Sequence, residues 1–78
     1  MSKVKTTYSL KEIIKILNQK GFYYERGNKH PYYCNDKGIC YALTMTKDPM
    51  RIGTLTELRG FLGFENWKEM QKFWESIK

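Results

Sequence analysis

The chain has little of what catalytic and membrane proteins usually need. It contains one histidine, two cysteines and two prolines among 78 residues. No apolar run approaches the roughly 18 residues of a membrane-spanning helix. There is no phosphate-binding glycine loop and no serine or cysteine triad, which excludes the common nucleotide-hydrolysing and acyl-transfer sites.

The two cysteines, Cys34 and Cys40, form no Cys-x-x-Cys pair. With His30 they provide only three candidate ligands, whereas a structural zinc site uses four at recurrent spacings, so we expect no metal and no cofactor. The first residues, Met-Ser-Lys-Val-Lys, lack the apolar core of a signal peptide. We therefore expect a cytoplasmic protein without membrane contact. Its cysteines should be reduced, although they could pair as a disulfide if they face each other.

Acidic residues are scarce in the first half. Residues 1–37 hold eight Lys or Arg against three Asp or Glu, and residues 38–78 hold six against five, within an overall charge of +6. An uneven basic charge indicates a polyanionic partner, and we expect nucleic acid, RNA in particular, although lysines can also serve solubility alone. Six Tyr, four Phe and two Trp supply the apolar surface that so short a chain needs.

Helical patterns stand at both ends of the chain. Residues 1–8 read as a loosely ordered lead. Ser9 and Glu12 have capping-box spacing, and Gly21 suits a helix end. Ser9 thus opens a helix whose apolar stripe is Leu10, Ile13, Ile14 and Leu17.

Two further helices follow residue 53. A second capping box over Thr54–Glu57 predicts a helix with Leu55, Leu58, Phe61 and Leu62 as its core side and Gly63 at its end. Asn66 is predicted to cap a last helix, whose apolar side is Trp67, Met70, Phe73, Trp74 and Ile77.

The middle of the chain predicts strands. Residues 22–25 read as a short aromatic strand and residues 26–29 as a turn. Asn35–Gly38 suits a hairpin turn with Gly38 at positive φ. That turn sets a register of Cys34 opposite Cys40, Tyr33 opposite Tyr41, Tyr32 opposite Ala42 and His30 opposite Thr44.

Alternation then divides the residues of this hairpin between two faces. Ile39, Tyr41, Leu43 and Met45 should face the helices, and Tyr33 should be core. The opposite face should be open and should carry His30, Tyr32, Cys34, Cys40, Ala42 and Thr44. The expected fold is α+β in one domain: a core of helix, three-stranded antiparallel sheet and helix over residues 9–64, and an added helix over residues 65–78, with the helices on one sheet face.

This layout resembles the HicA-type toxins of bacterial toxin-antitoxin systems over residues 9–64. The matching features are Leu-Lys-Glu-Ile-Ile-Lys-Ile-Leu at residues 10–17, Gly21-Phe22, His30 and Gly-Thr-Leu-Thr-Glu-Leu-Arg-Gly-Phe-Leu-Gly at residues 53–63. The usual Gly-Ser-His of that family appears here as Asn28-Lys29-His30, and the second histidine of many members is absent.

The resemblance implies a double-stranded-RNA-binding-like fold, metal-independent cleavage of RNA and a silencing antitoxin partner. His30 would then be the catalytic acid or base, with the second proton role left to water, a tyrosine or a lysine. Arg26 and Lys29 would offset phosphate charge. Tyr32 would share the face of His30, and Lys11 and Lys15, with Lys20 in the same row, would contact a groove of the duplex.

Two other functions fit the same residues. One is a non-catalytic RNA- or DNA-binding module that uses the basic first half. The other is a small phage-type interaction protein that inhibits a host enzyme or defence complex through the aromatic last helix or the open sheet face.

Overall fold

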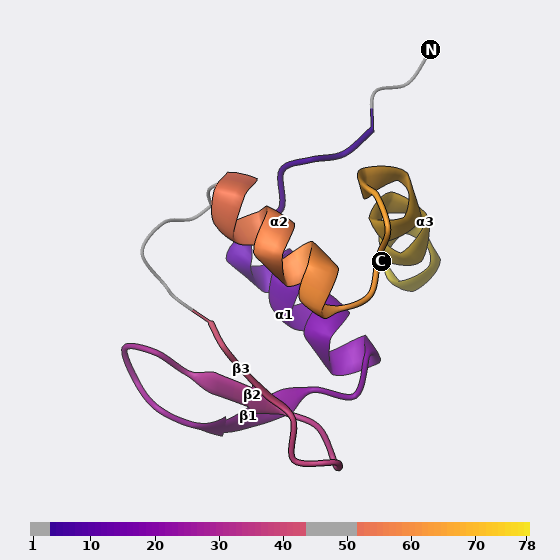
Figure 1. Ribbon diagram of the computed structural model, residues 1–78. Helices are drawn as coiled ribbons and strands as arrows, with labels where there is room; N and C mark the ends of the chain where they lie inside the picture. The colour runs from indigo at the N-terminus through magenta and orange to yellow at the C-terminus, as the bar shows by residue number, and fades with distance from the viewer. Residues whose placement is uncertain (1–3, 44–51) are drawn as a thin grey trace.

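The elements follow one another in the predicted order. The computed structural model describes residues 4–43 and 52–78, and over these ranges it forms a mixed α+β fold. The helices are α1 (Leu10–Gln19), α2 (Ile52–Phe61) and α3 (Trp67–Ile77), and the strands are β1 (Tyr23–Arg26), β2 (Tyr32–Cys34) and β3 (Cys40–Ala42). The helices lie on one side of the antiparallel sheet β1-β2-β3, which leaves its other face open (Figure 1).

The ends of α1 are those that the sequence predicts. The Ser9 hydroxyl accepts from the Glu12 N–H, and the Ser9 N–H donates to the Glu12 carboxylate at 2.8 Å, which completes the capping box. Beyond the helix, Gly21 has φ +90°. The Phe22 N–H donates to the Leu17 carbonyl, and the Gly21 N–H donates to the Asn18 carbonyl. These are the two hydrogen bonds of a Schellman motif.

The buried side of α1 is broader than the predicted stripe. Ile13 and Leu17 are fully buried as expected, whereas Leu10 and Ile14 are only partly buried. Ile16, which lies outside the stripe, is also fully buried. The added helix α3 packs against α1, a contact that the stripe of α1 alone does not predict.

The hairpin has the predicted register. Cys34 pairs with Cys40, Tyr33 with Tyr41 and Tyr32 with Ala42. Gly38 has φ +83°, and the Asn35 side chain accepts from the N–H groups of Lys37 and Ile39, which closes the turn. The pairing of His30 with Thr44 involves a residue outside the described ranges.

Two details of the sheet differ from the prediction. The first strand runs one residue later than expected, since Phe22 closes the ending of α1. Ile39 was expected to face the helices, but its side chain is 49% exposed because it lies in the turn before β3 begins. Leu43 is fully buried as predicted, and Met45 lies outside the described residues.

The predicted cap of α2 is wrong. The helix already includes Ile52, so Thr54 lies within its first turn and cannot have the extended backbone of an N-cap residue. The core side is close to that expected: Leu55, Leu58 and Leu62 are buried, but Phe61 is 37% exposed. Gly63 ends the helix at φ +86°, with the Phe64 N–H returning to the Arg59 carbonyl.

The last helix and the N-terminal lead join in one core. Asn66 caps α3 by accepting from the Glu69 N–H at 2.9 Å, and Met70 is fully buried. The lead was expected to be loosely ordered, yet Tyr8 is fully buried against Trp74 at a centroid distance of 6.4 Å, and the Lys5 N–H donates to the Gln71 side chain. Within the described ranges, no helix has the length and apolar character to cross a bilayer.

Candidate nucleic-acid interface

A fixed loop between β1 and β2 carries His30. Gly27 opens it at φ +98°, and a Cβ at this position would lie 2.5 Å from the His30 carbonyl oxygen, so the chain folds back too tightly for any side chain here. The Tyr24 hydroxyl donates to the Gly27 carbonyl at 2.8 Å. At the other end Pro31 is buried, and its carbonyl accepts from the Leu43 N–H at 2.9 Å. The loop is therefore anchored at both ends.

Lys29 and His30 are both exposed on this loop. Within the described part of the chain, no hydrogen bond or ion pair involves the His30 imidazole. A histidine that acts as a general base is normally oriented by a second group. The structure therefore presents an imidazole that a ligand can reach, without the orienting partner that an efficient nuclease would supply.

Arg26 and Tyr32 come together on the open face. The register shifts between Tyr24 and Arg26, so that Arg26 pairs with Tyr32. Its guanidinium lies 4.9 Å from the centre of the Tyr32 ring, and it also contacts the Glu25 carboxylate at 3.2 Å. Tyr32 is 37% exposed while Tyr33 is 7% exposed, which confirms that the two tyrosines lie on opposite faces.

The cysteines are not the reduced pair that we expected. Cys34 and Cys40 are bonded as a disulfide across the hairpin, with their Cα atoms 4.0 Å apart. The predicted register itself brings this about, because residues directly opposite on antiparallel strands have their side chains on the same face. The bond lies on the open face, beside Glu25.

The helical lysines lie apart from this face. Lys11 and Lys15 are exposed on α1, which lies on the covered side of the sheet (Figure 1). The Lys15 ammonium lies 5.8 Å from the Trp74 ring, and that of Lys20 lies 4.6 Å from the Phe64 ring. Lys15 and Lys20 are thus directed toward aromatic side chains around α3, and the structure does not group Lys11 and Lys15 with the loop.

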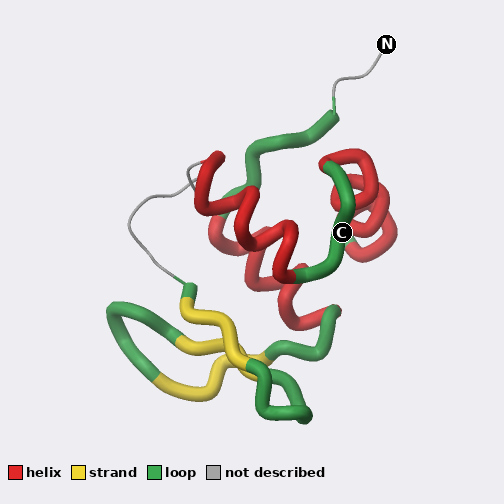
Figure 2. The backbone as a smooth tube through the Cα atoms, in the orientation of Figure 1, coloured by secondary structure: helices red, strands yellow, loops and turns green. Residues whose placement is uncertain are grey.

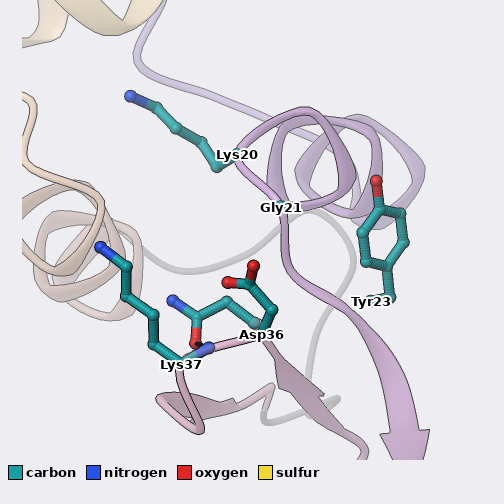
Figure 3. Close-up of a pocket in the computed structure, with 6 residues that line it drawn as sticks. Lys20, Gly21, Tyr23, Asp36 and Lys37 are labelled. Carbon is teal, nitrogen blue, oxygen red and sulfur yellow. Dashed lines mark hydrogen bonds between the residues drawn. The ribbon is translucent and has the colours of Figure 1, made fainter.

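A hollow of about 360 Å³ lies at the other end of the sheet. Figure 2 shows that the β1–β2 loop and the hairpin turn leave opposite ends of β2. The hollow lies between that turn and the end of α1 (Figure 3), and is lined by Lys20, Gly21, Tyr23, Asn35, Asp36 and Lys37. Tyr23 is 60% exposed and pairs with Cys34. Sequence reasoning missed it, since only the register of β1 places its side chain on the open face.

Burial keeps the core tyrosines neutral. It raises the pKa of Tyr33 and, with a smaller contribution from Glu57, that of Tyr41. Neither hydroxyl is therefore suited to accept a proton near neutral pH. The tyrosine that stands beside Arg26 is Tyr32, at the sheet surface.

Comparison with known proteins returned no match to a family model, to a curated protein or to a solved structure.

Proposed function

We propose that the protein binds RNA through the β1–β2 loop and the adjoining open face of the sheet. The observation that carries this proposal is the Arg26 guanidinium held 4.9 Å from the Tyr32 ring, next to a loop on which Lys29 and His30 are exposed. These four residues are called the loop site below.

The chemistry of the loop site suits unpaired nucleotides. Bases stack on tyrosine rings and on guanidinium planes, and lysine attracts the phosphates. Because Arg26 is already stacked on Tyr32, less side-chain freedom is lost when a ligand binds. The overall charge of +6 adds a long-range attraction for any polyanion.

Binding of labelled single-stranded RNA, followed by fluorescence anisotropy, tests this proposal. Tyr32→Ala should weaken binding by about 1 to 3 kcal/mol, the usual value of one stacked base. Arg26→Lys keeps the charge but loses the planar group, so it should also weaken binding. Lys29→Ala should weaken it through lost charge.

Lys72→Ala is the matched control, because it removes one exposed lysine from α3. The loop site would be the wrong location if Lys72→Ala weakened binding as much as Lys29→Ala. Lys11→Glu with Lys15→Glu tests the alternative footprint on α1. Loss of binding in that double variant, with the loop variants unaffected, would move the interface to the helix.

Cleavage of the bound RNA is the second candidate function. The exposed imidazole of His30, next to the positive charge of Lys29, favours it, as does the resemblance to HicA-type toxins. Cleavage that persists in chelator and disappears in His30→Ala would support it. No cleavage by the native chain at micromolar concentration would leave binding as the whole function.

A further inference from the structure

Three ligand atoms of different strands meet on the open face. The Sγ atoms of Cys34 on β2 and Cys40 on β3 and a carboxylate oxygen of Glu25 on β1 all lie within 4.8 Å of one another. The sequence had offered His30 as a third candidate ligand for a metal site that we did not expect. In the structure Glu25 is the residue beside the cysteine pair. It lies at the register shift between Tyr24 and Arg26, whereas His30 lies on the loop.

The disulfide decides whether these atoms can bind a metal, since a cysteine binds a metal as the thiolate and a disulfide-bonded sulfur is not one. Cys40 is exposed, so a small dithiol can reach the bond. The dithiol supplies two electrons and two protons, the Sγ–Sγ bond breaks, two thiols form, and the dithiol becomes a disulfide. Metal binding then releases the two thiol protons to solvent.

We propose that the reduced chain binds one Zn²⁺ through Cys34, Cys40 and Glu25, with water in the fourth position. Zinc accepts thiolate and carboxylate ligands in a tetrahedron. Zn–S bonds of about 2.3 Å place two sulfurs roughly 3.8 Å apart, which the opposed pair reaches by side-chain rotation alone. Cys34 and Cys40 stay opposite because the backbone bond from the Asn35 N–H to the Ile39 carbonyl, 2.9 Å long, holds the turn.

The zinc proposal does not rest on RNA binding, but one of its ligands contacts the loop site. Glu25 is the ion-pair partner of Arg26 at 3.2 Å. A carboxylate that binds zinc gives up much of its attraction for a neighbouring guanidinium. The open face can therefore hold either the disulfide or a zinc ion, but not both. Only bound zinc would weaken the ion pair between Glu25 and Arg26.

The experiment uses the full chain, reduced with a phosphine under nitrogen. Zn²⁺ is titrated against a chromogenic chelator, and Co²⁺ serves as a spectroscopic substitute. We expect one metal per chain and a thiolate-to-cobalt charge-transfer band. Both should be absent in the oxidised chain and in Cys34→Ser. Glu25→Gln should weaken zinc binding by about 10- to 100-fold or more, since even residues behind the ligands have effects of that size.

Asp36→Asn is the matched control for Glu25→Gln, because it also removes one exposed negative charge but lies outside the cluster. Circular dichroism of each reduced variant shows whether it is folded. The proposal is overturned if the reduced chain binds zinc no more tightly than Cys34→Ser. It is equally overturned if Glu25→Gln and Asp36→Asn bind zinc with the same affinity.

Discussion

Gly27 and Gly38 both have positive φ, but only one of them is also crowded. A Cβ on Gly27 would meet the His30 carbonyl at 2.5 Å, whereas a Cβ on Gly38 would meet nothing within 4 Å. Gly38→Ala should therefore cost only the backbone strain of about 1 kcal/mol, and Gly27→Ala should cost more, because the loop must also open. Urea denaturation of the two variants measures the difference.

RNA binding gives a second measurement on the same pair. Gly27→Ala should weaken binding because it moves His30 and Lys29, and Gly38→Ala should leave binding close to that of the native chain. Equal stability and equal binding in the two variants would show that the fold of the loop does not matter.

Tyr8 has a buried hydroxyl without a hydrogen-bond partner among the described residues. Burial first, then the carboxylates of Glu12 and Glu75, raise the pKa of Tyr8 from 10.0 to about 12. Since the folded chain holds this proton more tightly than the unfolded chain, the stabilisation is complete below pH 10 and is lost as the pH rises toward 12. The loss should be about 2 kcal/mol at pH 12.

Tyr8→Phe tests this directly by thermal denaturation between pH 8 and pH 12. At pH 8 the variant should be as stable as the native chain or slightly more stable, because it removes an unsatisfied polar group. Its alkaline loss should be smaller, with the remainder due in part to Tyr33 and Tyr41, whose pKa values are also raised. Identical pH profiles for the two proteins would contradict the assignment.

At the scale of the element, two similar sequence signals have different outcomes. Ser9 caps α1 with both bonds of the box formed, whereas Thr54 lies inside α2. Ser9→Ala should therefore destabilise the protein by about 1 kcal/mol. Thr54→Ala should be neutral or slightly stabilising, because alanine has the higher helix propensity. Chemical denaturation of both variants distinguishes them, and an equal loss from Thr54→Ala would restore it as a cap.

The register of the hairpin allows its two cysteines either to form a disulfide or to bind zinc together. Asn35 and Gly38 close the turn, and the turn places Cys34 opposite Cys40. The same register makes a disulfide when the sulfurs are oxidised, and it gives the proposed zinc site two thiolates when they are reduced. The turn residues thus determine which cysteines meet on the open face, although they do not lie on that face themselves.

At the scale of the whole molecule, charge sets the expected salt dependence. Each phosphate that a protein neutralises on a single strand contributes about −0.7 to the slope of log K against log salt. Lys29→Ala should therefore reduce the magnitude of that slope by about 0.7, and Lys72→Ala should leave it unchanged. Anisotropy titrations over a range of potassium chloride concentrations measure both slopes. A binding constant that does not change with salt would exclude an electrostatic interface.

Many of the aromatic residues divide between core and surface according to the layers of the fold, although Tyr24 and Phe61 are exposed outside the open face. Tyr8, Phe22, Tyr33 and Phe64 are buried, and Tyr23 and Tyr32 are exposed on the uncovered face of the sheet. The large aromatic side chains of α3 are partly buried, since Trp67, Phe73 and Trp74 pack against the core. An inhibitory partner that bound through these three side chains would have to displace them from that packing.

The sequence by itself determined the elements whose signals are local. The capping box at Ser9, the glycine endings at Gly21 and Gly63, and the hairpin register each depend on residues within about six positions of one another. Interactions at this range are set by backbone geometry and by the hydrogen bonds of the turn, so these three signals could be read from the sequence, although the equally local signal at Thr54 could not.

Only the tertiary structure decided which residues are buried outside the predicted stripes and which side chains lie together on the surface. Ile16 is fully buried although it lies outside the apolar stripe of α1, and the contact of Arg26 with Tyr32 depends on an irregular register that no nearby turn signal predicts. The meeting of Glu25 with Cys34 and Cys40 requires three strands to align. These arrangements result from packing between distant segments, and alternation along one segment cannot specify which partner will lie beside it.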